Sequence, residues 1–161
     1  MKAYDIRRSD RAQSESTAVE ILKKGSYGVL STVGADGYPY GVPVNYVYDD
    51  VKIYFHCAKS GHKLDAVRAN DKVSFCVIDK NEVDAEKLTT LFKSVVVFGR
   101  AKIMSDTEKI KSAMTMFGLK YNNDVAAVEK EIQREWNGLC CVEISIEHIT
   151  GKQAIELMKK E

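Results

Sequence analysis

The sequence predicts an α+β fold in which a mainly β barrel with Greek-key connections carries peripheral helices. Three observations support this class. Short segments rich in Val, Ile, Tyr and Phe recur along the chain, and tight turns join the first three into a meander. Two adjacent helical segments precede the last strand, so helices and strands do not alternate as they do around a parallel sheet. The 161 residues suit one core, and we expect a single domain over residues 1–161.

Charge and composition exclude several functional classes. Twenty-four Lys and Arg against 23 Asp and Glu leave a net charge of +1, which gives no general attraction for nucleic acid or an anionic membrane. The N-terminal region has no apolar run of a signal peptide, so we expect a cytoplasmic location. Four cysteines lack both CxxC spacing and the density of a disulfide scaffold, and we expect them to be reduced: Cys57, Cys76, Cys140 and Cys141.

A short helix leads into the first strand. Thr17, with Glu20 three residues later, fits a capping box at the start of this helix. An apolar stripe at helical spacing follows and stops at Gly25; it consists of Ala18, Ile21 and Leu22. Residues 27–33 then have the composition and alternation of a strand.

The next two strands complete the meander. Asp36 and Gly37 form a turn, after which residues 38–48 make the partner strand of a hairpin. Two prolines lie inside this partner, and proline cannot donate a ladder hydrogen bond, so we expect an edge strand that is open to a ligand. A second turn leads to a third strand over residues 51–56.

A crossover helix and two further strands follow. Ser60 is placed as the N-cap of the helix, and Asn70 as its C-terminal stop. Residues 73–78 alternate like a strand, and residues 93–104 form a longer one. Between them, residues 79–91 are polar and are predicted to be a loop with a helical turn.

Two helical segments and a closing strand complete the chain. Residues 106–120 and 123–136 have helical periodicity, and residues 139–146 form the closing strand. Trp136, at the end of the second helix, is either a packing residue or a cover for a bound ligand.

The start of the crossover helix has an unusual charge pattern. His62 and Lys63 stand in its first turn, where the positive end of the helix dipole favours anions over cations. A phosphate bound to the free N–H groups, Ser60 and these basic side chains would reverse that cost. The alternative is that both side chains point into water while Asp65 offsets the dipole.

An aromatic strand end lies just before this helix. Tyr54, Phe55 and His56 lead into it through a short loop, which suits a planar aromatic ligand with a phosphate tail. Whichever aromatic residue faces inward is expected to be ordinary core packing. His56 has no second ligand at a familiar zinc spacing, and no metal site is expected.

Five motifs occur in the order and spacing of a known family. They are Tyr27-Gly28-Val29-Leu30-Ser31-Thr32, Gly37-Tyr38-Pro39, Val42-Pro43-Val44-Asn45-Tyr46, Ile53-Tyr54-Phe55-His56-Cys57-Ala58 and Gly61-His62-Lys63-Leu64-Asp65. Together with the end segment Ile146–Lys152, they resemble the FMN-binding split β-barrels of the pyridoxamine 5'-phosphate oxidase group. The Phe-His-x-Ala form of the fourth motif resembles the nitroimidazole-resistance (Nim-type) branch.

The resemblance implies a cofactor, a partner and a set of site residues. The strand segment that lies along the isoalloxazine ring of FMN would be Val42, Pro43, Val44, Asn45 and Tyr46. Phe55 and His56 would flank the ring and the ribityl chain, with Ser60, His62 and Lys63 at the phosphate. In this family a second subunit completes the site, here through Lys93 and Ser94, so a homodimer with two FMN is implied.

The implied activity is an FMN-dependent reductase, and His56 is its candidate catalytic residue. It would orient a substrate or donate a proton while electrons pass from a small-molecule donor to a nitroimidazole, another nitro compound or a quinone. The alternatives are a non-catalytic protein that binds FMN, haem or a deazaflavin, and a flavin-free dimer of the same fold.

Two departures from the family pattern qualify the resemblance. Cys57 stands where many relatives have glycine, which brings a thiol to the expected flavin site. The chain also lacks the C-terminal Trp and Arg segment with which the oxidases hold pyridoxamine phosphate, so that oxidase activity is not expected.

Overall fold

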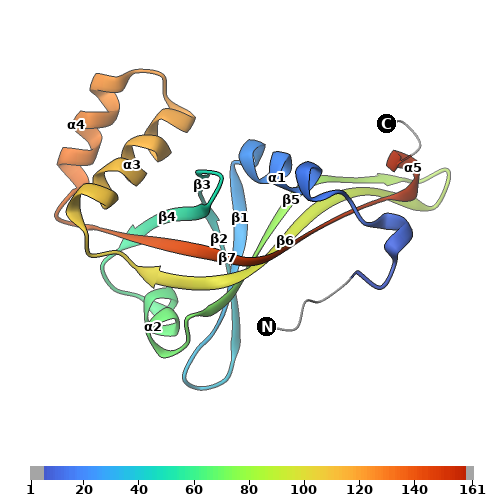
Figure 1. Cartoon of the computed structure of the whole chain (residues 1–161), viewed down its shortest axis with the longest axis horizontal. Helices are drawn as coiled ribbons and strands as arrows, with labels where there is room; N and C mark the ends of the chain where they lie inside the picture. The colour runs from blue at the N-terminus through green and yellow to red at the C-terminus, as the bar shows by residue number, and fades with distance from the viewer. Residues whose placement is uncertain (1–5, 159–161) are drawn as a thin grey trace.

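A single curled sheet of seven strands forms the centre of the computed structural model, which describes residues 6–158 (Figure 1). The strands are β1 (Tyr27–Val33), β2 (Pro39–Asn45), β3 (Val47–Tyr48), β4 (Lys52–Ala58), β5 (Lys72–Asp84), β6 (Thr89–Ile103) and β7 (Leu139–Gln153). Around it lie a 3-10 helix, η1 (Ser9–Arg11), and the helices α1 (Glu15–Lys24), α2 (His62–Ala69), α3 (Thr107–Tyr121), α4 (Val125–Glu135) and α5 (Ile155–Met158). The α+β class is confirmed.

The sheet is curled because its two edges are joined through one residue. The strand order is β2-β1-β5-β6-β7-β4-β3, so β2 and β3 lie at opposite edges, with every pairing antiparallel. Only Tyr46 separates them in the chain. Consecutive Cα atoms are about 3.8 Å apart, so the edges must meet at this corner. Beyond it β2 pairs with β1 and β4 with β7, which leaves the barrel split between β2 and β4.

Helices close the barrel and supply part of its core. Figure 1 shows α1 and α2 on opposite sides of the curled sheet. Both contribute apolar side chains to one buried cluster with the strands, among them Leu22 of α1, Leu64 of α2 and Phe75 of β5. Tyr46 is fully buried in this cluster, and its hydroxyl donates a hydrogen bond of 2.7 Å to the Leu22 carbonyl. The corner is therefore fixed to the core by packing and by a satisfied polar group.

An antiparallel helical hairpin, α3 and α4, stands outside the barrel at the left of Figure 1. Asp106 caps α3 by accepting the N–H groups of Glu108 and Lys109, and Asp124 caps α4 by accepting the N–H of Ala127. A second, smaller core forms where α3 covers β7, around Ala113, Met114 and Cys141. Among residues 6–158, no helix is both long and apolar enough to cross a membrane.

The strand over residues 27–33 and the pair of helices before the last strand are confirmed, but two helix caps differ from the prediction. α1 begins at Glu15 because the Ser14 hydroxyl accepts the Thr17 N–H at 3.2 Å, so Ser14 is the N-cap in place of Thr17. The N-cap of α2 is Gly61 and not Ser60. Gly61 has a φ of 133°, which residues with a side chain rarely adopt, and this conformation sets the helix start one residue later.

Most of residues 79–91 belong to strands, and the predicted loop is reduced to a turn over residues 85–88. β5 continues to Asp84 and β6 begins at Thr89, which makes a long hairpin with a register shift between Ile78 and Lys80. Most side chains of the hairpin tip are exposed on both faces of the ribbon, so no apolar alternation marks it as a strand. The predicted strand over residues 38–48 is likewise two strands, β2 and β3, because Tyr46 turns the corner.

Candidate functional site

The split between β2 and β4 opens into a cavity beneath the helical hairpin. This cavity has a volume of about 420 Å³ and is lined by Asn45 at the end of β2, His56 of β4 and the inner faces of α3 and α4. In β4, Ile53 and Phe55 point into the core, so the alternate residue His56 points outward. The strand period therefore places the imidazole in the cavity.

His56 packs against an aromatic face of α3. Its ring lies edge-on to Phe117, with centroids 4.8 Å apart and planes at 83°, and Phe117 in turn lies 5.3 Å from Tyr121. Burial against the helices lowers the pKa of His56, while Glu135 acts in the opposite direction. The imidazole is thus neutral at physiological pH and has one N–H to donate.

Polar contacts fix α3 to the barrel corner. The Lys120 ammonium donates to the carbonyls of Gly25, at 2.5 Å, and Tyr46, at 3.0 Å, and lies 4.3 Å from the centre of the Tyr46 ring. Tyr121 donates to the carbonyls of Ser26 and Tyr46, and the Asn45 amide also donates to Ser26. These bonds hold the aromatic face of α3 over the split and orient the Asn45 side chain.

The other end of the split is the N-terminus of α2. The helix has no side-chain cap, although α1, α3 and α4 each have one. A side chain at Gly61 would meet no atom within 4 Å, so the space in front of the helix is open. His62 lies edge-on to Tyr40 of β2 at 4.5 Å between centroids. An open helix start with two basic side chains has the composition of a phosphate site, so the residues fit the phosphate of a flavin nucleotide.

The predicted strand segment contributes outward side chains from alternate positions. Pro43 and Asn45 are exposed, whereas Val42 and Val44 pack against the core. Tyr46 and Phe55 are fully buried, with no exposed surface. These two side chains face the core and not the split. Only the main chain of these two residues can contact a ligand there.

Lys93 and Ser94 lie away from the split of their own chain. β5 begins directly after α2, with Lys72 opposite Arg100, whereas Lys93 is opposite Lys80. Along β5, Lys80 lies eight residues beyond Lys72, which corresponds to roughly 25 Å of extended strand. One protomer therefore does not bring Lys93 and Ser94 to His62 and Lys63.

Cys57 and Trp136 face away from the cavity. Cys57 packs on the core side of β4 opposite Cys140, and burial raises the pKa of its thiol. Cys57 is half-buried, and Lys63 acts on its pKa in the opposite direction to burial. Trp136 lines a different pocket, together with Thr107 and Lys111 at the start of α3, and is not among the residues that line the cavity around His56.

The functional residues that the sequence did not indicate come from α3. Phe117 and Tyr121 stand four residues apart, so they share one helix face, and this spacing is visible in the sequence. Their role depends on where the helix docks, which is a tertiary property. Lys120 resembles an ordinary surface lysine in sequence, yet burial lowers its pKa and both its hydrogen bonds reach backbone carbonyls in partly buried positions.

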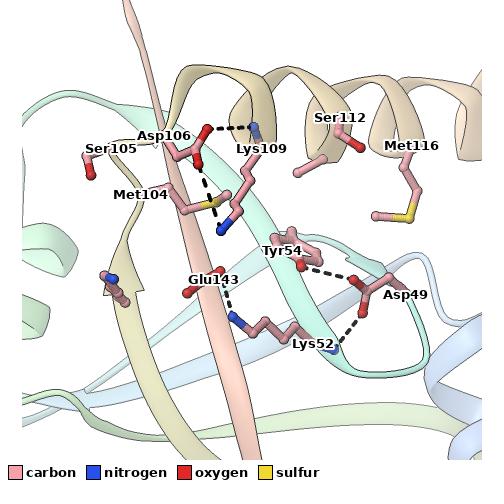
Figure 2. A pocket seen from close by; sticks show the side chains of 12 residues that line it. Asp49, Lys52, Tyr54, Met104, Ser105, Asp106, Lys109, Ser112, Met116 and Glu143 are labelled. Carbon is pink, nitrogen blue, oxygen red and sulfur yellow. Dashed lines mark hydrogen bonds and ion pairs between the residues drawn. The ribbon is translucent and has the colours of Figure 1, made fainter.

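A second cavity, of about 370 Å³, lies at the start of α3 (Figure 2). Several of its polar groups pair with one another: Lys52 contacts Glu143 at 2.9 Å, and the Tyr54 hydroxyl donates to Asp49 at 2.9 Å. Burial, together with Asp49, raises the pKa of Tyr54, so the phenol remains protonated. Figure 2 shows these groups turned toward each other across the cavity. They stabilise the junction of β4, β7 and α3, and we place the candidate site at the split.

Comparison with known proteins agrees with this architecture. A family model described as pyridoxamine 5'-phosphate oxidase matches residues 14–153. A 5a,11a-dehydrotetracycline/5a,11a-dehydrooxytetracycline reductase of Streptomyces rimosus is 32% identical over 90 residues, which are 53% of this chain and 61% of the relative. The chain thus spans less than two thirds of the length of that relative.

Two solved structures show the same fold. A candidate 5-nitroimidazole antibiotic resistance protein from Bacteroides thetaiotaomicron has a TM-score of 0.71 at 18% identity, over 87% of this chain and 84% of the other. An FAD-binding protein from Mesorhizobium loti has a TM-score of 0.63 at 27% identity, over 89% and 97%.

Proposed function

Because this chain belongs to the pyridoxamine 5'-phosphate oxidase family, we propose that it is an FMN-dependent reductase that passes electrons from a nicotinamide nucleotide to a nitro compound or a quinone. The reductase from Streptomyces rimosus supports an oxidoreductase role. The observation that carries the proposal is the geometry of the split. There, the His56 side chain of β4 faces a cavity, and β4 leads directly to the open, uncapped start of α2.

The start of α2 favours FMN over FAD. The terminal phosphate of FMN concentrates up to two negative charges on one group, whereas each phosphate of FAD carries one. This concentrated charge is matched by His62, Lys63 and the uncapped start of a helix. Ser60, just before Gly61, adds a hydroxyl donor. The flavin ring would then lie along the outer faces of β2 and β4, with main-chain groups of Val44 and Asn45 at its edge.

The residues of the chain would position the substrate and supply protons. FMN, when bound, accepts and returns electrons in pairs. Reduction of a nitro group to a nitroso group consumes two electrons and two protons and releases water. His56 is the titratable side chain of β4 that faces the cavity. We assign its N–H as a donor of the protons that this reduction consumes. Asn45, held by Ser26, would orient the polar end of the substrate.

We further propose that the active form is a homodimer. Lys93 and Ser94 are remote from α2 in one chain, so a second copy is needed for them to meet the phosphate of the first. The long β5–β6 hairpin carries exposed apolar side chains, including Val83 and Leu88, which suit an interface between copies.

Anaerobic spectroscopy tests the proposed function. The purified protein is titrated with FMN, then NADH or NADPH is added, then a nitroimidazole or a naphthoquinone. The proposal requires flavin absorbance bands that the nicotinamide nucleotide bleaches and the acceptor restores. Bound flavin that neither nucleotide bleaches would indicate a carrier or a different donor. Absence of flavin binding would refute the proposal.

A further inference from the structure

The aromatic cavity beneath the helical hairpin has a definite chemical character. Three rings form a row along one wall, since His56 contacts Phe117 and Phe117 contacts Tyr121. Aliphatic side chains of both helices and of β7 line most of the rest, among them Met114, Ile132 and Leu139. The volume of about 420 Å³ falls within the range of small-molecule sites, roughly 300–1,000 Å³. Because these rings are tilted to one another, the wall offers both ring edges and ring faces to a flat aromatic ligand.

Four of the polar side chains that line the cavity form two pairs, and the others, Tyr121 and Asn122, lie at the C-terminal end of α3. Asn45 and His56 lie at the barrel side, where they can bond to the polar end of a ligand. Glu131 and Glu135 lie at the outer side on consecutive turns of α4, and Arg134 forms ion pairs with both. Among the described residues that line the cavity, none is a lysine or an arginine.

This distribution discriminates by charge. An anionic ligand would lose hydration in an apolar cavity with no lining cation to replace it. It would also face Glu131 and Glu135, which share the single positive charge of Arg134 and so keep a net negative charge. Partial burial lowers the pKa of His56, so the imidazole adds no positive charge at neutral pH. An uncharged ring loses little hydration and gains the stacking contacts.

We propose that this cavity is the acceptor site, and that it selects uncharged planar aromatic compounds over anionic ones. The inference rests on the proposed reductase function, because it names the substrate class of the same site. Asn45 and His56 would meet the reducible group, and the aromatic face of α3 would cover the ring. α4 would set the charge preference through Glu131 and Glu135.

The test measures binding to the oxidised, FMN-loaded protein by calorimetry, where no turnover occurs. 4-Nitrobenzyl alcohol and 4-nitrobenzoate share the ring and the nitro group and differ in charge. We expect the alcohol to bind about tenfold more tightly or better, since the carboxylate loses hydration without compensation. Equal dissociation constants for the two compounds would overturn the charge preference.

Variants locate the binding site. Ala127→Phe places a ring in the cavity from α4 and should weaken binding of the alcohol by about tenfold. Glu135→Lys should reduce the ratio of the dissociation constants of the two compounds. Glu129→Lys makes the same charge change on the other face of α4 and should leave this ratio unchanged. Retained flavin absorbance shows that each variant is folded. Unaltered binding in folded Ala127→Phe would refute the cavity as the site.

The two proposals fail in different ways. If the binding pattern appears but the chemically reduced protein is not reoxidised by either compound, the reductase function fails and the cavity assignment stands. If both compounds reoxidise the reduced protein equally well and bind with equal dissociation constants, the reductase function stands and the acceptor site lies elsewhere.

Discussion

His62 and Lys63 are the residues on which the position of the flavin phosphate depends. Each charge-assisted hydrogen bond contributes about 1.5–3 kcal/mol, so the double variant His62→Ala, Lys63→Ala should weaken FMN binding by at least tenfold. Flavin fluorescence during titration measures this. The double variant Lys24→Ala, Lys111→Ala removes two exposed lysines away from α2 and serves as the control. Equal FMN affinity in the two double variants would rule out the start of α2 as the phosphate site.

The environment of His56 predicts a pH dependence of stability. Its pKa in the folded protein is lowered by burial, so between that value and its ordinary value of about 6.5 the unfolded chain binds more protons than the folded chain. The contribution of a neutral His56 is therefore complete above pH 6.5 and is lost as the pH falls below it. Urea unfolding at pH 7.5 and pH 5.5 should show a smaller loss of stability on acidification for His56→Gln than for the wild type. The same loss in both would contradict the assigned shift.

Among the elements of the fold, the corner between β2 and β3 depends on the hydroxyl oxygen of Tyr46, so its removal should lower the stability of the protein. Tyr46→Phe leaves the Leu22 carbonyl unpaired in the core, and a buried unsatisfied group costs about 1–3 kcal/mol. Tyr38→Phe removes a hydroxyl from a side chain that is 74% exposed, so its effect should be below about 0.5 kcal/mol. Chemical denaturation of both variants checks this, and equal stabilities would show that the hydroxyl does not fix the corner.

The hydrogen bonds of Lys120 fix α3 to the barrel corner, and two lysine variants of this helix test their contribution to stability. Lys120→Ala removes two partly buried hydrogen bonds from a cation to backbone carbonyls and should lower the free energy of unfolding by about 2 kcal/mol. Lys111→Ala changes an exposed lysine of the same helix and should have little effect. Because α3 carries Phe117 over His56, Lys120→Ala should also raise the pKa of His56 toward its ordinary value, which NMR titration measures.

The elements differ in how far the sequence predicts them. β1 and the α3–α4 pair carry clear apolar periodicity or capping aspartates, and their positions follow from the sequence. The tip of the β5–β6 hairpin has both faces exposed, so no pattern marks it. The cavity depends on α3 docking at the corner through Lys120 and Tyr121, and contacts between residues 95 or 74 positions apart leave no local signal.

For the whole molecule, the proposed dimer predicts complementation between two defective chains. His62→Ala, Lys63→Ala damages the part of the site at α2, and Lys93→Ala, Ser94→Ala damages the part that we assign to the second copy. In a heterodimer of these two chains, one site carries both defects and the other carries none. We expect each homodimer to bind FMN weakly and the purified heterodimer to bind about one FMN tightly per dimer.

The same experiment distinguishes a site within one chain. If each protomer holds its own flavin, a heterodimer has one defect in every site and recovers no tight binding. A monomer at working concentration in sedimentation analysis would contradict the shared site at once.

The most direct measurement is an FMN titration of the purified protein, followed by absorbance under anaerobic conditions. We expect saturation at one FMN per chain, with flavin bands shifted from those of free FMN and tight binding that depends on His62 and Lys63. A folded protein whose addition leaves the FMN spectrum unchanged at saturating concentration would contradict the assignment of the split between β2 and β4 as a flavin site.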